Sequence, residues 1–348
     1  MTGSKRTNEP RAKPWIVTLL EHPHFRARAG LVFGGVVITL VILEVGMRLF
    51  YPHAFAAPPD EISLTYHYDS DLGWFPVPNS QKRITASRTI TAVHNSEGFR
   101  APEPSKPIKP GLIFLGDSLV WGFDVEAPER FTEKLQAKHP NWAVYNFGIS
   151  GYGTDQEYLL LQKFFDEYKP RLVMLVICGD NDNEDNAWNC RGGYYKPWYT
   201  FKEGHLRLNG IPVPRSEKTF FAEHEILGHV RLLRLCTHVY YKLTAPVPSR
   251  NPDPPTGVLL LEMRKYVVER GALFAVSLQR SNAELEQFLK QFKIPYVDLT
   301  TTNPGHLYPK FGNHWTPAGH TFVAEKMDKF LSSTLASGNA PPDLPESG

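Results

Sequence analysis

Hydrophobic and polar positions divide the chain into three regions of different pattern. Residues 29–43 form an uncharged apolar run that stops at Glu44. Residues 52–108 are rich in Pro, Ser and Asn and show few regular patterns, so we predict an irregular lead-in that wraps the main domain. From residue 109 to about 335, short apolar runs alternate with amphipathic ones, which predicts strands alternating with helices.

This alternation predicts an α/β fold with three layers, a central and mostly parallel sheet between two layers of helices. The predicted strands are 111–116, 142–148, 171–179, 273–278 and 294–299, and the predicted helices are 131–138, 155–168, 257–269, 284–292 and 317–335. Thr316 and Pro317 fit the N-cap and first position of the last helix. Residues 191–256 break the alternation with a hairpin pattern at 198–208, so we predict an insertion over one edge of the sheet.

The first apolar run predicts a transmembrane helix over residues 29–51. Its uncharged part would span about 22 Å at 1.5 Å per residue, whereas a hydrocarbon core is about 30 Å thick. The helix must therefore take in Glu44 and Arg48, which can pair at spacing i, i+4. A buried core helix is one alternative. A cleaved signal peptide is another, although its candidate site at Ala54–Ala56 lies far beyond the apolar run.

Charge is unevenly distributed along the chain. Residues 1–28 carry a net charge of +4, and the rest of the chain carries −2. The basic tail predicts an N-terminus in the cytoplasm, so the chain after residue 52 would lie on the periplasmic or extracellular side of the cytoplasmic membrane. The near-neutral main region argues against a nucleic-acid partner. We expect residues 336–348 to form a flexible tail.

Cysteines and histidines give no sign of a metal site. Cys178 falls in a predicted strand and should be a buried thiol, whereas Cys190 and Cys236 could form a disulfide in an oxidising compartment. His306, His314 and His320 lack ligand spacing with cysteines or carboxylates. The sequence also has no glycine-rich phosphate loop. We therefore predict no metal and no cofactor.

Candidate catalytic residues follow the predicted strands in chain order. Ligands of open parallel sheets bind at the carboxyl ends of the strands. The first strand ends in Gly116-Asp117-Ser118, which would place a serine hydroxyl at that edge. The segment Asn313-His314-Trp315 precedes the last helix, a fixed position that suits a general base. Each feature alone is also explained by turn or capping chemistry.

Donors for an oxyanion hole are present at the same edge. The backbone N–H of Ser118 would lie at a helix start, and Gly151 follows the second strand, where its N–H can approach a substrate oxygen. Asn181 follows the third strand and could add a side-chain donor. The conjunction of these features predicts one site at the edge of the sheet.

Residues 109–335 resemble the SGNH or GDSL-type hydrolases, whose fold is similar to that of flavodoxin. Gly116-Asp117-Ser118, Gly151, Asn181 and His314 match the four conserved blocks of that family. The resemblance implies Ser118 as nucleophile, His314 as base, and Ser118, Gly151 and Asn181 as the oxyanion hole. The apolar helix, the Leu72–Trp74 and Gly98–Arg100 segments and Asn181–Asn186 are similar to a bacterial membrane-anchored branch.

One position departs from the family pattern. The family has an Asp three, sometimes two, residues before the catalytic His, where this chain has Phe311 and Gly312. A triad Asp orients the base and stabilises its imidazolium. His314 could instead be oriented by a backbone carbonyl, or by Asp298 at the end of the last strand, or the activity could be weak or absent.

The sequence thus predicts a membrane-anchored carboxylic-ester hydrolase that works through an acyl-enzyme on acyl esters or acylated glycans outside the cytoplasmic membrane. An O-acetyltransferase acting on an exported polysaccharide is one alternative, because the segment from His314 to His320 resembles SGNH-like proteins that handle acetyl groups. A non-catalytic envelope scaffold or glycan-binding protein is the other alternative, favoured by the missing Asp.

Overall fold

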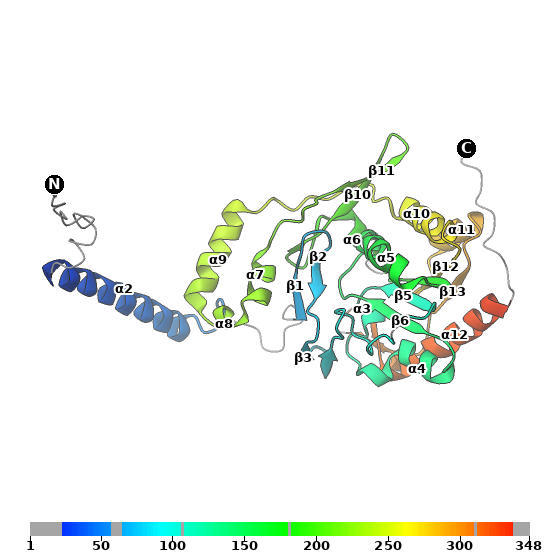
Figure 1. Ribbon diagram of the computed structural model, residues 1–348, viewed down its shortest axis with the longest axis horizontal. Helices are drawn as coiled ribbons and strands as arrows, with labels where there is room; N and C mark the ends of the chain where they lie inside the picture. The colour runs from blue at the N-terminus through cyan, green and yellow to red at the C-terminus, as the bar shows by residue number, and fades with distance from the viewer. Residues whose placement is uncertain (1–22, 57–64, 106–107, 180–181, 310–311, 337–348) are drawn as a thin grey trace, which may run out of the picture. The chain divides into compact units, whose positions relative to one another are not determined.

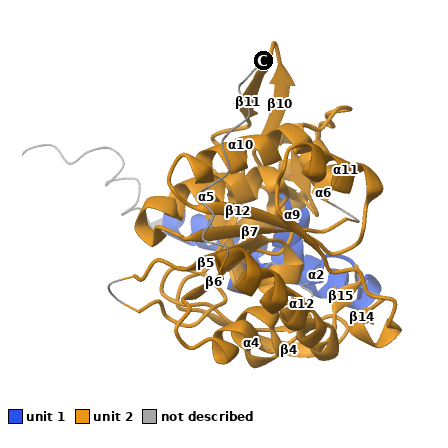
Figure 2. Ribbon diagram, turned by 90° about the vertical axis from the view of Figure 1, so that its right-hand side faces the viewer, with its two compact units in different colours: residues 1–57, 226–237 blue, residues 58–225, 238–348 orange. Residues whose placement is uncertain are grey.

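The structure is a computed structural model that describes residues 23–56, 65–105, 108–179, 182–309 and 312–336. Contacts divide the chain into two units (Figure 2). The smaller unit consists of the N-terminal helix and residues 226–237, and the larger unit contains the rest. Asn181 and Phe311 lie outside the described residues, as do the predicted flexible residues 337–348.

The larger unit is built on a parallel sheet of five strands in the order β13-β12-β7-β5-β6 (Figure 1). Their bounds are Leu112–Gly116 for β5, Val144–Gly148 for β6, Leu172–Ile177 for β7, Leu273–Leu278 for β12 and Tyr296–Asp298 for β13. All five predicted strands are confirmed, with no end shifted by more than two residues. Their unbroken apolar runs are explained by burial on both faces.

Alternate residues of the strands belong to two separate cores. Ile113 and Leu175 face a core shared with α5 (Thr154–Tyr168), α10 (Thr256–Val268) and α11 (Ala283–Gln291). Phe114 and Met174 face a second core shared with α4 (Phe131–Lys138) and α12 (Pro317–Ala336). The sheet therefore lies between two helix layers, and the predicted α/β/α fold is confirmed.

The lead-in is more regular than predicted. It contains two antiparallel hairpins, β1 (Tyr66–Asp69) with β2 (Gly73–Pro76) and β3 (Gln81–Thr85) with β4 (Thr89–Val93). The prediction of an irregular segment was wrong because these strands are only four or five residues long. Moreover, β3 carries two charges, so its alternation of buried and exposed positions is weak in the sequence.

Helix α6 (Asp182–Ala187) connects strand β7 to the insertion. The insertion contains β8 (Cys190–Arg191), β9 (Tyr194–Tyr195), α7 (Glu217–Glu223), α8 (Glu225–Gly228) and α9 (Arg231–Thr244). The predicted hairpin is confirmed as β10 (Trp198–Lys202) and β11 (His205–Asn209), which form their own two-stranded sheet. The ammonium of Lys196, before β10, is fully buried and pairs with Asp155 of α5.

Helix α2 (Pro23–Phe50) belongs to the smaller unit. Residues 24–50 make it the one helix in the described part of the chain that is long and apolar enough to cross a membrane, with a mean hydropathy of 2.2 in its most apolar window. None of that window is buried, so the alternative of a core helix is wrong. Cys178 is buried as predicted, whereas Cys190 and Cys236 are free thiols and form no disulfide.

Candidate active site

Ser118 lies at the turn from β5 into the short helix α3 (Ser118–Trp121). Asp117 caps this helix, because its side chain accepts a hydrogen bond from the N–H of Leu119 at 2.9 Å. The cap leaves Ser118 as the first residue of the helix, with a partly exposed side chain. No acceptor in the described ranges receives its backbone N–H. A hydroxyl and an N–H donor are therefore available at the carboxyl edge of the sheet.

His314 reaches this serine from 196 residues further along the chain. Its Nε2 lies 2.8 Å from Ser118 Oγ, within hydrogen-bond distance. His314 belongs to the short strand β15 (His314–Trp315), which pairs with β14 (Leu307–Tyr308). Thr316 caps the following helix, as predicted, by accepting from the N–H of Gly319 at 3.1 Å. This frame fixes the imidazole beside the hydroxyl.

The other imidazole nitrogen faces a carboxylate that the sequence analysis did not single out. Asp124 Oδ2 lies 3.5 Å from His314 Nδ1, and the Asp124 side chain is almost fully buried. Its other oxygen, Oδ1, accepts from the backbone N–H groups of Ser87 at 2.8 Å and Arg88 at 3.4 Å. Burial alone would raise the pKa of Asp124, but His314 and the donors of Ser87 and Arg88 outweigh it and hold this pKa below its ordinary value. The carboxylate is therefore ionised at neutral pH.

Asp124, rather than a backbone carbonyl or Asp298, is the group that faces His314 Nδ1. In the described part of the chain, Asp124 is the carboxylate that pairs with His314. Asp298 Oδ1 instead accepts from the N–H and the hydroxyl of Thr300, at 2.8 and 2.5 Å. Ser118, His314 and Asp124 thus follow one another in the order hydroxyl, imidazole and carboxylate, which is the order of a serine-hydrolase triad.

The loop after α3 brings Asp124 back to the histidine within six residues of the serine. Gly122 and Asp124 both have left-handed backbones, with φ of +82° and +67°. A Cβ on Gly122 would also lie 2.3 Å from Arg130 Cδ, so only glycine fits there. The Phe123 ring, between them, packs on the His314 ring with centroids 4.6 Å apart. The loop thus contacts the histidine through Phe123 as well as through Asp124.

Two buried arginines stabilise the same loop by hydrogen bonds to its backbone carbonyls. Arg100 donates to the carbonyls of Gly122 at 2.6 Å and Val125 at 2.8 Å, and both Arg100 and Arg130 donate to the carbonyl of Trp121 at 3.2 Å. Burial and the neighbouring Arg130 charge lower the pKa of Arg100 to about 9. The Gly98–Arg100 segment of the lead-in therefore supports the loop that carries Asp124.

The Leu72–Trp74 segment supports the predicted oxyanion loop in a similar way. Trp74 Nε1 donates to the carbonyl of Ser150 at 3.3 Å, and Tyr152 donates its hydroxyl to the carbonyl of Trp74 at 2.6 Å. Between them, Gly151 has φ of +85° and an N–H that no described residue accepts. The N–H of Gly151 is available to a ligand, whereas Asn181, the third predicted donor, lies outside the described residues.

The two other histidines that were considered as metal ligands, His306 and His320, have structural surroundings. His320 is buried, and its Nδ1 accepts from the N–H of Phe131 at 3.2 Å. Burial lowers the pKa of His320 well below its usual value. His306 Nδ1 contacts the hydroxyl of Thr301 at 2.8 Å. Within the described ranges, no cluster of His, Cys, Asp and Glu could hold a metal ion.

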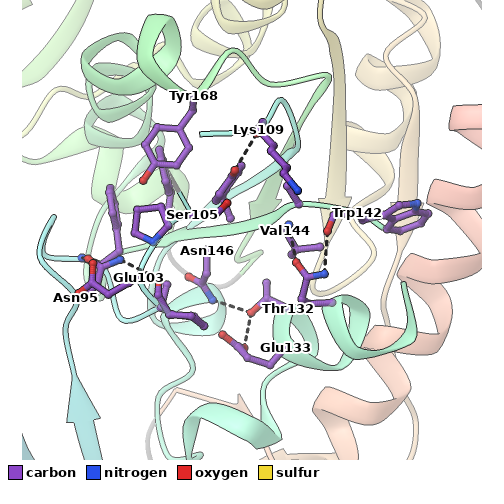
Figure 3. Close-up of a pocket in the computed structure, with 18 of the residues that line it drawn as sticks. Asn95, Glu103, Ser105, Lys109, Thr132, Glu133, Trp142, Val144, Asn146 and Tyr168 are labelled. Carbon is purple, nitrogen blue, oxygen red and sulfur yellow. Dashed lines mark hydrogen bonds between the residues drawn. The ribbon is translucent and has the colours of Figure 1, made fainter. Parts of the chain in front are cut away.

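The hollow in Figure 3 is a different place on the molecule. It has a volume of about 480 Å³ and lies along the edge strand β6, and neither Ser118 nor His314 lines it. Its wall includes Asn146, whose Nδ2 donates to the hydroxyl of Thr132 at 2.9 Å and to the carbonyl of Val120 at 2.7 Å. The edge strand therefore supports α3 through this amide.

Several buried carboxyl groups lie behind the nucleophile. Glu157 of α5 is fully buried, and neither of its carboxyl oxygens has a hydrogen-bond partner. Burial, followed by the charges of Asp182, Asp117 and other neighbouring carboxylates, raises the pKa of Glu157 well above its usual value. The same causes raise the pKa of Asp182. Glu157 should therefore keep its proton to a higher pH in the folded protein than in the unfolded chain.

The Glu157→Gln variant should be more stable than the wild type, and the difference should grow as the pH rises. Above a pH of about 4.3 the unfolded chain releases the Glu157 proton while the folded protein keeps it, so rising pH favours unfolding by up to about 1.4 kcal/mol per pH unit. Thermal unfolding between pH 5 and 8 measures this. Glu167→Gln, an exposed change on the same helix, is the control. A constant difference between Glu157→Gln and wild type would contradict a raised pKa of Glu157.

Comparison with known proteins shows what the chain is similar to. The chain is similar to a protein of the G-D-S-L family from Veillonella parvula (13% identity, 64% of this chain and 99% of that chain, TM-score 0.39). It is also similar to the esterase EstA from Pseudoalteromonas (11% identity, 66% of this chain and 100% of that chain, TM-score 0.39). A third similar structure is a family 3 carbohydrate esterase from Clostridium thermocellum (12% identity, 66% of this chain and 98% of that chain, TM-score 0.36). No curated protein matches it. The sequence profile of the GDSL-like lipase/acylhydrolase family matches residues 114–322, more than half of the chain, and we conclude that the chain belongs to this family.

Proposed function

We propose that the protein is a serine ester hydrolase in which Ser118 is the nucleophile, His314 the general base and Asp124 the residue that positions the base. The observation that carries this proposal is the 2.8 Å contact between Ser118 Oγ and His314 Nε2, with Asp124 behind Nδ1. The non-catalytic alternative was based on the missing Asp before His314. Because Asp124 supplies a carboxylate from another loop, that basis no longer holds.

The reaction would proceed in two steps through an acyl-enzyme. His314 takes the proton of Ser118 as Oγ attacks the ester carbonyl, and the N–H groups of Ser118 and Gly151 hold the oxyanion. His314 then gives the proton to the leaving alcohol. In the second step, His314 takes a proton from water, the hydroxide attacks the acyl-enzyme, and Ser118 recovers its proton as the acid leaves. We retain Asn181 as a third oxyanion donor on the family resemblance.

The same proposal includes a location. Helix α2 would anchor the protein in the cytoplasmic membrane as a single, uncleaved span, with the basic N-terminus inside and the hydrolase outside. Its length of 27 apolar-rich residues and the +4 charge of residues 1–28 support this topology. The substrates would then be acyl esters reachable from outside the membrane, and we include acylated glycans among them.

A fluorophosphonate probe tests the active serine directly. Incubated with the full chain in detergent, it should label wild-type protein at Ser118, because a serine activated by a histidine attacks phosphorus as it attacks a carbonyl. The Ser118→Ala variant should not be labelled. Failure of folded wild-type protein to react would support a non-catalytic scaffold instead.

Product analysis separates hydrolysis from transfer. With an acetylated donor, the wild type should release free acetate at the same rate whether or not a glycan acceptor is added. Transfer of most acetyl groups to the acceptor would contradict the proposed hydrolase and identify an O-acetyltransferase that uses the same site.

A further inference from the structure

Helix α9 of the insertion begins against the last turns of helix α2. The two carboxylate oxygens of Glu44 accept from the backbone N–H groups of Arg231 at 3.2 Å and Leu232 at 2.9 Å, the first two residues of α9. These N–H groups have no partner within their own helix, and a carboxylate there is also favoured by the helix dipole. A charged residue of the apolar helix thus caps a helix that lies 187 residues further along the chain.

Two arginines complete this joint. Arg231 donates to the carbonyls of Met47 at 3.3 Å, Tyr51 at 2.9 Å and Pro52 at 2.7 Å, near the end of α2. Arg48 donates in the other direction, to the carbonyl of His229 at 2.7 Å, and also pairs with Glu44. The end of α2 thus satisfies backbone N–H groups at the start of α9, and Arg231 of α9 satisfies carbonyls at the end of α2. The first turn of α9 therefore lies beside the last two turns of α2.

One face of α9 is apolar and exposed. Cys236, Val239, Tyr240 and Leu243 follow the spacing i, i+3, i+4, i+7, which places them on one side of the helix. Tyr240 is 60% exposed and Leu243 is 79% exposed. Ile226 of the preceding helix α8 is 83% exposed.

The charges of α9 are all of one sign. The helix contains Arg231, Arg234 and Lys242 and no acidic residue. A short amphipathic helix with basic residues and exposed apolar and aromatic side chains is typical of helices that lie in a membrane interface. Tyrosine is also enriched at that level of the bilayer.

We propose that α9 lies in the outer headgroup layer of the membrane that α2 spans, with its apolar face among the acyl chains and its basic residues near lipid phosphates. This proposal rests on the proposed anchoring by α2. The first turn of α9 is bonded to the exit end of the proposed spanning helix, so α9 begins at headgroup depth. At 1.5 Å per residue, its 14 residues would cover about 21 Å of membrane surface.

Spin labels measure the depth of α9 in the full-length protein, reconstituted in vesicles of phosphatidylethanolamine and phosphatidylglycerol. In a Cys190→Ser background, one label is attached to the native Cys236 and another, after Cys236→Ser, to Leu243→Cys. The matched control is Leu208→Cys, an exposed apolar position of strand β11 in the same insertion. The ratio of collisions with oxygen, which enters the bilayer, to collisions with a water-soluble nickel complex should be several-fold higher at 236 and 243 than at 208.

The outcomes distinguish this proposal from the others. A ratio at 236 and 243 equal to that at 208 would overturn the interfacial helix. Exclusion of both reagents that is lost on dilution into excess lipid would also overturn it and show that a second copy of the chain covers the face. Extraction of the protein by alkaline carbonate would instead refute the anchor. Ester hydrolysis, measured separately, tests the catalytic proposal alone.

Discussion

Alanine at position 118 should lower kcat for p-nitrophenyl acetate by about a million-fold, to a rate supported only by the remaining oxyanion donors and substrate binding. The expected size follows from the arrangement of the site. In the described structure, Ser118 supplies the only nucleophilic atom within 2.8 Å of His314 Nε2. Without this hydroxyl, His314 has no nucleophile to activate and no acyl-enzyme can form. The measurement is the initial rate of nitrophenolate release by the full-length protein.

Ser281→Ala is the matched control for this variant. Ser281 is exposed and follows strand β12 at the same carboxyl edge of the sheet, and its hydroxyl bonds Glu286 at 2.5 Å rather than a histidine. Its rate should stay within a few-fold of wild type. A Ser118→Ala protein that is folded and hydrolyses the ester at an undiminished rate would exclude this site as the catalytic centre.

Asparagine at position 124 should lower kcat by about ten-thousand-fold, while KM stays close to the wild-type value. The amide oxygen of Asn can still accept from the N–H groups of Ser87 and Arg88, so the loop keeps its position. Its NH₂ group would then face His314 Nδ1, which must carry a proton if Nε2 is to accept one from Ser118. The amide therefore favours the wrong tautomer and removes the negative charge that stabilises the imidazolium.

Asp298→Asn is the control for the position of the carboxylate. Its side chain would keep the acceptor used by Thr300, and its kcat should be unchanged. Unfolding temperatures of both variants near that of wild type would show that the loss at position 124 is kinetic. If Asp124→Asn retained at least a tenth of the wild-type kcat, His314 and Ser118 would be working as a dyad.

The strands and helices of the hydrolase domain could be predicted because burial on two faces leaves strong signals. The strand 172–177 is an unbroken apolar run, and the helix 154–168 has an apolar stripe. Ser118 and His314 could also be identified from the sequence. Ser118 follows a predicted strand, and His314 precedes a helix whose N-cap, Thr316, is recognisable. The contact between them depends on the parallel order of the strands, which the alternation of elements predicts.

Asp124 could not be predicted in the same way. Its role depends on two left-handed backbone positions in the loop and on donors from a hairpin turn that we had predicted as irregular. The family pattern also directed attention to the residues just before His314. The signal present in the sequence was Asp124 itself, a single acidic residue in the otherwise uncharged run from Leu119 to Val125. The structure shows that this carboxylate is buried.

The hydrogen bonds from the β3–β4 turn to Asp124 limit how far the chain can be shortened without loss of activity. The family profile begins at residue 114, and a shortened protein starting at 109 would still contain Ser118, Asp124 and His314. It would lack Ser87, Arg88 and Arg100, leaving the Asp124 carboxylate without its backbone donors and the loop without its guanidinium support. A catalytically complete fragment must therefore include the β3–β4 hairpin and Arg100, and shortened versions for crystallisation or screening should be cut between helix α2 and Tyr66, ahead of both lead-in hairpins.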